Sequence, residues 1–222
     1  MINIAIDGPA GAGKSSLSRK LAANLGYIYV DTGALYRATG LKFSRLGFDT
    51  SLEGDIEAVL KNTVVDLKFV NGEQRVFLDG ADVSDLIRTP EASMMASAVS
   101  AKPAVRAFLL DMQRLLAKNN NVVMDGRDIG TVVLPDADVK IFLTADVEER
   151  AKRRLLELTE KGQTVSFEEV LADMKQRDYN DSHREIAPLK QAEDAVLADT
   201  TKLDLEGSLE LLEKIVREGT AK

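Results

Sequence analysis

The chain of 222 residues contains no cysteine, no tryptophan and only one histidine. The absence of cysteine excludes disulfide bonds and cysteine-ligated metal sites, and it fits a reducing compartment, so we expect a cytoplasmic location. The histidine, His183, forms no recognisable triad with an acidic and a hydroxyl residue, and we interpret it as incidental. Neither a thiolate metal centre nor a histidine-based nucleophile is therefore expected.

Long apolar runs and an excess of positive charge are also missing. No stretch approaches the roughly 18 apolar residues that a membrane-spanning helix requires, and a first strand starting at Ile2 leaves no room for a signal peptide. The net charge is −7 at pH 7. This charge argues against binding to a nucleic acid polymer or a membrane, because both require a positive protein surface. If the chain handles phosphate, its arginines must gather locally.

A glycine-rich segment follows the first apolar run. Residues 8–15 read Gly-Pro-Ala-Gly-Ala-Gly-Lys-Ser, and they stand between strand-like residues 2–6 and a segment with helical apolar spacing. A strand, a G-x-x-x-x-G-K-S loop and a helix in this order bind a nucleoside triphosphate. Backbone N–H groups and the helix dipole favour phosphate, Lys14 adds a charge, and Ser15 offers a hydroxyl to Mg²⁺. The loop predicts ATP or GTP binding.

The order of the remaining elements predicts an α/β fold. Residues 27–30 are a second β-rich run ending at Asp31, so residues 2–31 form a βαβ unit and imply a parallel sheet. Further strands are expected at 122–125, 139–144 and 195–197, with helices at 104–118, from 146, from 167 and at 208–216. The helix after Asp31 is expected to be capped by Thr32. It carries Arg37 to the carboxyl edge of the sheet, where phosphate contact is favoured over a solvated charge.

Residues 51–102 read as an insertion into the parallel fold. We expect an amphipathic helix at 51–61, then a hairpin of residues 64–70 and 74–78 with its turn at Asn71-Gly72. A third short strand at 81–85 and a helix at 88–102 follow. The pair Met94-Met95 is interpreted as core packing. An antiparallel hairpin within a parallel α/β chain predicts a separate subdomain.

Two basic clusters occupy the last third of the chain. A helix from Asp146 carries four basic residues, Arg150, Lys152, Arg153 and Arg154, and Lys161-Gly162 separates it from a helix starting at Phe167. Two helices joined by a glycine predict a lid that closes arginines over phosphate. In the second cluster Arg177, Asp181 and Arg184 share a helix face. For Arg177 and Asp181, an internal ion pair and ligand contact remain open alternatives.

Dispersed arginines and a compact chain favour a small-molecule phosphotransferase. The arginines would fasten two anionic ligands that repel each other and neutralise the transferring phosphoryl group. The N-K-x-D guanine motif of switching GTPases is absent. Two alternatives remain open: another small kinase, such as one for adenylate, uridylate or shikimate, and a nucleotide-dependent binding module with little turnover.

Four segments in this order resemble the bacterial cytidylate kinases. They are residues 6–14 (Ile-Asp-Gly-Pro-Ala-Gly-Ala-Gly-Lys), 31–37 (Asp-Thr-Gly-Ala-Leu-Tyr-Arg), 125–133 (Asp-Gly-Arg-Asp-Ile-Gly-Thr-Val-Val) and 177–188 with Arg177-Asp178, Arg184 and Ala187-Pro188. The hairpin insertion also resembles the nucleoside-monophosphate subdomain of that family. The resemblance covers nearly the whole chain. It departs only at Thr32, where some members have serine and the hydroxyl is retained.

The resemblance implies transfer of the γ-phosphoryl group of ATP to CMP or dCMP, with Mg²⁺, by a monomer. The ATP-binding residues would be Gly8, Pro9, Ala10, Gly11, Ala12, Gly13, Lys14, Ser15 and Ser16, with Ser15 on the metal. The substrate-binding residues would be Thr32 and Arg37 on the phosphate, Ser97, Arg106 and Asp128 around cytosine, and Arg177 and Asp181 on the sugar. The catalytic residues would be Lys14, Arg127, Arg184 and Arg154.

The resemblance also implies a division of the single chain. The P-loop core would comprise about residues 1–35, 103–145 and 185–222, a parallel sheet flanked by helices. The inserted NMP-binding subdomain would comprise about 36–102, and the short lid about 150–166. No general base is expected, because the acceptor phosphate is already ionised at neutral pH.

Overall fold

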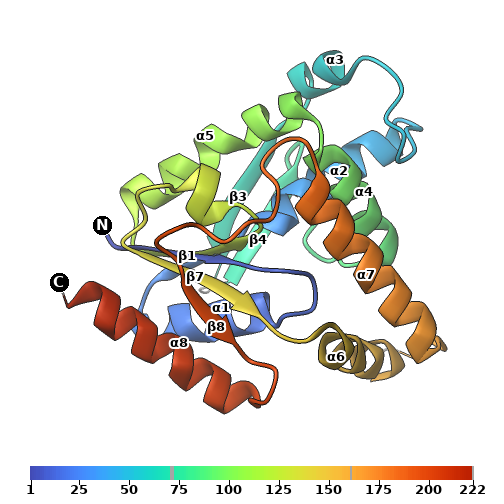
Figure 1. Ribbon diagram of the computed structural model, residues 1–222. Coiled ribbons are helices and arrows are strands. Elements are labelled where there is room, and N and C mark those ends of the chain that lie inside the picture. Colours follow the sequence, from blue (N-terminus) through green and yellow to red (C-terminus); the bar gives the residue numbers. More distant parts are fainter. Residues whose placement is uncertain (71–72, 161, 222) are drawn as a thin grey trace.

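The computed structural model describes residues 1–70, 73–160 and 162–221. Its main sheet is parallel, with the strand order β2-β6-β1-β7-β8. Figure 1 labels three of these strands, β1, β7 and β8. The strands are β1 (Asn3–Asp7), β2 (Ile28–Asp31), β6 (Val122–Gly126), β7 (Val139–Thr144) and β8 (Val196–Asp199). Because β1 lies in the middle, the glycine loop that follows it emerges at the centre of the carboxyl edge. The predicted α/β fold with a parallel sheet is confirmed.

Helices cover both faces of this sheet, and the strands alternate between two apolar clusters. Ile4 and Ile6 pack in a cluster with helices α1 (Lys14–Leu25) and α8 (Leu205–Thr220). Ala5, between them, packs in the other cluster, which includes α2 (Thr32–Arg45) and α5 (Pro103–Asn119). Successive strand residues point to opposite faces, so a sheet buried on both sides needs continuous apolar runs. That requirement explains the uninterrupted apolar stretches that mark these strands in the sequence.

The insertion forms a second, antiparallel sheet. Its elements are α3 (Ile56–Lys61), β3 (Val65–Val70), β4 (Glu73–Leu78), β5 (Ala81–Asp82) and α4 (Pro90–Ser100). The predicted hairpin is confirmed, with Val70 paired to Glu73. Its predicted turn, Asn71-Gly72, lies outside the described residues.

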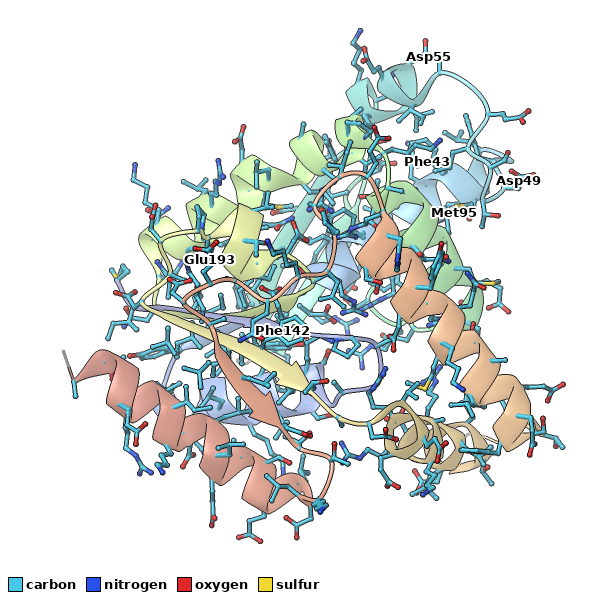
Figure 2. The ribbon with its side chains drawn as sticks, in the orientation of Figure 1. Phe43, Asp49, Asp55, Met95, Phe142 and Glu193 are labelled. Atoms are coloured by element: carbon cyan, nitrogen blue, oxygen red, sulfur yellow. The ribbon has the colours of Figure 1, made fainter. Side chains whose placement is uncertain are left out.

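Helix α4 joins the insertion to the core by packing on α2. A Cβ at Gly40 of α2 would lie 2.9 Å from Met95 Cγ, so the two helices approach as closely as a glycine allows. Figure 2 shows Met95 and Phe43 in the region where these helices meet. Met95 is 5% exposed, whereas Met94 is 51% exposed. The expectation of core packing therefore holds for Met95 and is wrong for Met94.

The predicted helix at 51–61 is wrong in its first half, because α3 begins at Ile56. Leu52 has φ 51° and Gly54 has φ 139°, values that no right-handed helix contains. Asp55 then caps α3, with Oδ1 accepting from Ala58 N at 2.9 Å. Figure 2 shows Asp49 and Asp55 around this outer turn, away from the main sheet. A capping carboxylate overrode the apolar periodicity that suggested a longer helix.

The cap of α2 also differs from expectation. Asp31, not Thr32, is the N-cap, and its Oδ1 accepts from Ala34 N at 3.0 Å. The Thr32 hydroxyl instead donates to the backbone oxygen of Asp125 at 2.8 Å. A third short strand was expected at 81–85, and the strand ends at Asp82. The other predicted elements are present with ends shifted by a few residues.

Two helices near the glycine loop form a small layer of their own. Helices α6 (Val147–Glu160) and α7 (Phe167–His183) pack together around Ala151, Leu158, Val170 and Met174, and Figure 1 shows them projecting beyond the end of the sheet. The N-terminus of α7 carries a capping box of Ser166 and Glu169. Lys161, part of the predicted break between the helices, lies outside the described residues. Within those residues, no helix has the length and apolar character needed to cross a membrane.

Candidate active site

The glycine loop has backbone conformations at Gly8 and Gly13 that only glycine adopts without strain. Gly8 has φ 153°, and a Cβ there would lie 1.9 Å from the backbone oxygen of Leu143. Gly13 has φ 84° and directly precedes α1. Both positions require glycine because other residues would clash or be strained. The loop therefore passes closely over the sheet, and α1 directs its N-terminal N–H groups to the space in front of the loop, a geometry suited to phosphate.

Lys14, at the start of α1, is buried and pairs with the loop backbone. Its Nζ donates to the Pro9 oxygen at 2.6 Å. Burial lowers the pKa of this ammonium, and the nearby Arg127 lowers it further, whereas Asp125 raises it. A buried cation with a backbone partner gains most from an incoming anion, because a phosphate group would replace the water it lost on burial.

Asp125, the last residue but one of β6, lies beside the loop and accepts hydrogen bonds from two hydroxyl groups. Ser15 Oγ donates to its Oδ2 at 3.1 Å, and Tyr29 OH donates to its Oδ1 at 3.0 Å. Burial raises the pKa of Asp125, and the charge of Asp31 raises it further. A serine hydroxyl next to a carboxylate is a hard-oxygen donor set, which suits Mg²⁺. The residues at this position therefore fit the predicted metal.

A cleft of about 400 Å³ opens in front of the loop, between the main sheet, α4 and α7. Most of the residues predicted for the site line it: Ala10, Gly11, Gly13, Lys14, Ser15, Ser16, Thr32, Arg37, Ser97, Arg106, Arg127, Asp128, Arg177, Asp181 and Arg184. Of the other predicted loop residues, Ala12 is fully buried in the core beneath the loop. Arginines distant in sequence are thus brought to the same cavity as Lys14, in a chain whose net charge is negative.

Asp128 lines this cleft and contacts two arginines. Arg106, from α5, contacts its Oδ2, and Arg184, just after α7, contacts its Oδ1 at 3.3 Å. Ser100, at the end of α4, receives a hydrogen bond from each arginine, through its backbone oxygen from Arg106 and its hydroxyl from Arg184. Burial raises the pKa of Asp128 while the two guanidinium groups lower it. Cations from two elements therefore hold one carboxylate in place.

The other cleft arginines are also paired with carboxylates. Arg37 NH2 contacts Asp31 Oδ2 at 2.8 Å, and Arg127 Nε contacts Asp181 Oδ2 at 2.7 Å. Arg177 pairs with Asp173 at 3.0 Å, so the alternative of an ion pair between Arg177 and Asp181 is wrong. Arg177 and Asp181 both line the cleft, as expected for residues that share a helix face. Asp181, however, pairs with Arg127.

Arg154 is the predicted catalytic residue that does not reach the cleft in this structure. Its guanidinium contacts Glu157 Oε2 at 3.0 Å on the surface of α6, and it is Glu157 that lines the cleft. Arg150, from the same helix, is buried instead. It donates to the Ala10 oxygen at 2.8 Å and to both oxygens of Asp178, and so joins the loop to α7.

Sequence reasoning assigned no role to Asp7, the last residue of β1. It accepts hydrogen bonds from the backbone N–H groups of Ile129 and Gly130, both at 2.7 Å. These residues begin a π-helical turn (Ile129–Val133) that the sequence did not predict. Burial raises the pKa of Asp7 to about 6, although the two N–H donors lower it. The feature of the sequence that could have identified Asp7 is its place as a carboxylate at the end of a buried strand.

Tyr36 was missed as well. Its ring lies against the guanidinium of Arg106, whose central carbon is 5.7 Å from the ring centroid, and both residues line the cleft. Because Tyr36 is one residue before Arg37 on α2, it could have been found from its position in the 31–37 segment. The one histidine, His183, is exposed and stacks on Tyr179.

The comparison with known proteins now decides the family. A family model described as cytidylate kinase matches residues 4–219. The chain belongs to the cytidylate kinase family. Cytidylate kinase from Caldicellulosiruptor bescii is 54% identical over 215 residues, covering 97% of this chain and 94% of the relative. The protein of the same description from Geobacter sulfurreducens is 51% identical over 219 residues, covering 97% and 92%.

A solved structure agrees in fold alone. The crystal structure of an uncharacterized protein from Eubacterium ventriosum has a TM-score of 0.55 and 14% identity, and it covers 98% of this chain and 99% of its own. Membership in the cytidylate kinase family makes the chain a kinase, so the alternative of a binding module with little turnover is set aside.

Proposed function

We propose that this member of the cytidylate kinase family transfers the γ-phosphoryl group of ATP to CMP or dCMP, and releases ADP with CDP or dCDP. The observation that carries the proposal is the shared cleft. Lys14 and the glycine loop lie at one end, and Asp128 between two arginines lies at the other. A donor triphosphate and an acceptor monophosphate would lie end to end between them.

The donor end would bind ATP mainly through the backbone. The N–H groups of residues 11–16 would face the phosphates, and Lys14, which now contacts the Pro9 oxygen, would contact the β- and γ-phosphates instead. Ser15 and Asp125 would hold Mg²⁺, which supplies neutralising charge to the phosphates when bound. The position of Ser15 against Asp125 would then orient the donor.

The acceptor end would select cytosine through Asp128. Cytosine presents an exocyclic amino group, which a carboxylate can accept, where uracil presents a carbonyl oxygen, which a carboxylate repels. A mismatched base would leave buried polar groups unpaired, and this penalty discriminates better than shape. Arg106 and Ser97 would complete the base pocket, and Arg177 and Asp181 would hold the sugar.

Catalysis would consist of alignment and charge neutralisation. Thr32 and Arg37 would bind the acceptor phosphate, while Arg127 and Arg184 would stabilise the charge on the transferring group. Arg154 would join them when α6 and α7 close over the nucleotides, because it is placed one turn from the cleft residue Glu157. No residue need remove a proton, since the attacking phosphate oxygen is already ionised.

We also propose how the chain divides into parts, where in the cell it acts and in which oligomeric state. We assign about residues 1–35, 103–145 and 185–222 to the P-loop core, 36–102 to the NMP-binding subdomain and 150–166 to the lid. We assign the kinase to the cytoplasm as a monomer that binds no nucleic acid polymer and no membrane. The absence of cysteine supports the cytoplasmic location, and the net charge of −7 argues against binding to nucleic acid polymers and membranes.

A coupled assay of ADP release with ATP and a panel of acceptors tests the function directly. CMP and dCMP should give the highest kcat/KM, with UMP, AMP and shikimate lower by about a hundredfold or more. Higher activity with any of the other acceptors would overturn the cytosine assignment.

A further inference from the structure

Strand β2 is an edge strand of the main sheet, and its last residue has backbone groups that point away from the sheet. In the strand order β2-β6-β1-β7-β8, β2 pairs with β6 on one side. The N–H and C=O of one strand residue point to the same side, and an unpaired edge exposes both. At Asp31 these groups face the insertion instead of solvent, because β4 of the second sheet contacts β2 there.

Gln74, from β4, pairs with this edge through its side-chain amide. Asp31 N donates to Gln74 Oε1 at 2.8 Å, and Gln74 Nε2 donates to the Asp31 oxygen at 3.2 Å. A primary amide has one acceptor and two donors in the arrangement of a peptide group. The Gln74 side chain thus completes the ladder as an added strand residue would, and it ties the inserted sheet to the core at one residue.

Asp31, which Gln74 holds by these two hydrogen bonds, fixes the start of α2. The Asp31 carboxylate caps the helix through Ala34 N and contacts Arg37 at 2.8 Å. Thr32 follows directly and is bonded to the backbone of Asp125. A displacement of the Asp31 backbone would therefore move the cap, Thr32 and the partner of Arg37 together.

We propose that Gln74 is a positioning residue for the acceptor phosphate: its amide transmits the position of the inserted sheet to Thr32 and Arg37. The inference rests on the proposed function, in which these two residues bind the acceptor phosphate. Gln74 itself lines a neighbouring cavity of about 130 Å³ between α1, α2 and β4, and it acts on the acceptor only through Asp31.

Replacement of Gln74 by methionine tests the inference. Gln74→Met keeps the length of the side chain and removes both hydrogen bonds. The KM and the dissociation constant for CMP should rise about tenfold, the loss expected for two hydrogen bonds. The dissociation constant for a non-hydrolysable ATP analogue should stay within about twofold, because the hydrogen-bond partners that the structure describes for Gln74 and Asp31 do not lie in the glycine loop. Calorimetric titration of each ligand provides a readout that does not depend on turnover.

Arg75→Met is the matched control. Arg75 is the next residue of β4, and its guanidinium contacts Asp82 and Asp85, so its ion pairs remain within the inserted region. This variant should bind CMP and the ATP analogue as the original chain does. Equal loss of CMP affinity in both variants would overturn the role of Gln74, since it would reflect general weakening of the insertion.

The outcomes separate the inference from the function on which it rests. If the original chain phosphorylates CMP and Gln74→Met has unchanged CMP affinity, or loses CMP and ATP-analogue affinity alike, the inference fails alone. If the original chain neither binds nor phosphorylates CMP, both fail. Thermal unfolding of each variant identifies a loss of folded protein. Gln74→Asn retains the amide but is too short to reach both Asp31 groups, and it should repeat the selective loss.

Discussion

The proposed donor end and the proposed acceptor end of the cleft hold their positive charge by different means. At the donor end, Lys14 contacts a backbone oxygen, and the loop presents N–H groups. At the acceptor end, arginines from α2, α5 and the segments after β6 and α7 each contact a carboxylate. The first end is built from one continuous segment, and the second is assembled from elements that meet only in the folded chain. A change at Lys14 should therefore alter the rate, and a change at Asp128 should alter the selectivity among acceptors.

This difference also explains what the sequence could predict. The donor end follows from residues 8–15, because a local motif contains both its backbone conformation and its charge. The parallel sheet and the hairpin follow from apolar runs and alternation. The partner of Asp181 could not be predicted, because Arg127 and Asp181 lie on different elements and helical spacing indicates only the shared face with Arg177.

Local capping chemistry likewise limited the prediction of helix ends. At the start of α2, both Asp31 and Thr32 could serve as caps, and only the position of Asp125 shows that the Thr32 hydroxyl has another partner. The π-helical turn after Asp128 depends on Asp7, which is distant in sequence. Such features depend on tertiary contacts, so a single sequence read along its length does not contain them.

The largest effect should come from the donor end. Lys14→Ala should lower kcat about a thousandfold, because it removes charge stabilisation of the transferring group. The preference for CMP over UMP should be retained, and the melting temperature should change by only a few degrees. Lys20→Ala, an exposed residue of the same helix, is the control for steady-state kinetics. Near-normal turnover in Lys14→Ala would contradict the mechanism.

At the acceptor end, Asp128→Ala should lower kcat/KM for CMP about a hundredfold and reduce the preference over UMP. The variant should also unfold at a lower temperature, because Arg106 and Arg184 lose their shared buried carboxylate. Asp136→Ala changes an exposed aspartate further along the chain and should leave both properties unchanged. A CMP to UMP ratio equal to that of the original chain would remove Asp128 from the base pocket.

A third experiment concerns Asp7, whose hydrogen bonds connect the strand before the loop with the turn after Asp128. Its pKa is raised to about 6 by burial, so protonation stabilises the folded chain below its unfolded pKa of 3.8, and this contribution is lost as the pH rises through about 6. Relative to Asp7→Asn, which does not titrate, the original chain should lose roughly 2 kcal/mol of unfolding free energy between about pH 4.5 and pH 7.5. Urea unfolding across this range measures the difference. A difference that is constant with pH would show that the carboxylate titrates normally.

The smallest effect should come from the lid. Arg154→Ala should lower kcat about tenfold and leave the CMP to UMP ratio unchanged, because Arg154 would reach the phosphates only on closure. Lys152→Ala changes an exposed cation of the same helix and should have no effect. Amide hydrogen exchange in α6 and α7 should slow when both nucleotides are bound. Exchange that is the same with and without nucleotides would argue against closure of these helices.

The position of β6 inside the sheet limits where the chain can gain or lose residues. Strand β6 lies between β1 and β2, and the four residues that end it and follow it, Asp125 to Asp128, all line the cleft in which both nucleotides are proposed to bind. Adding or deleting one residue there would shift the register of two sites at once. The outer turn at 49–55 touches neither site, and insertions should be tolerated there. Permitted changes in length should therefore be concentrated at the periphery of the insertion, while the end of β6 keeps a fixed length.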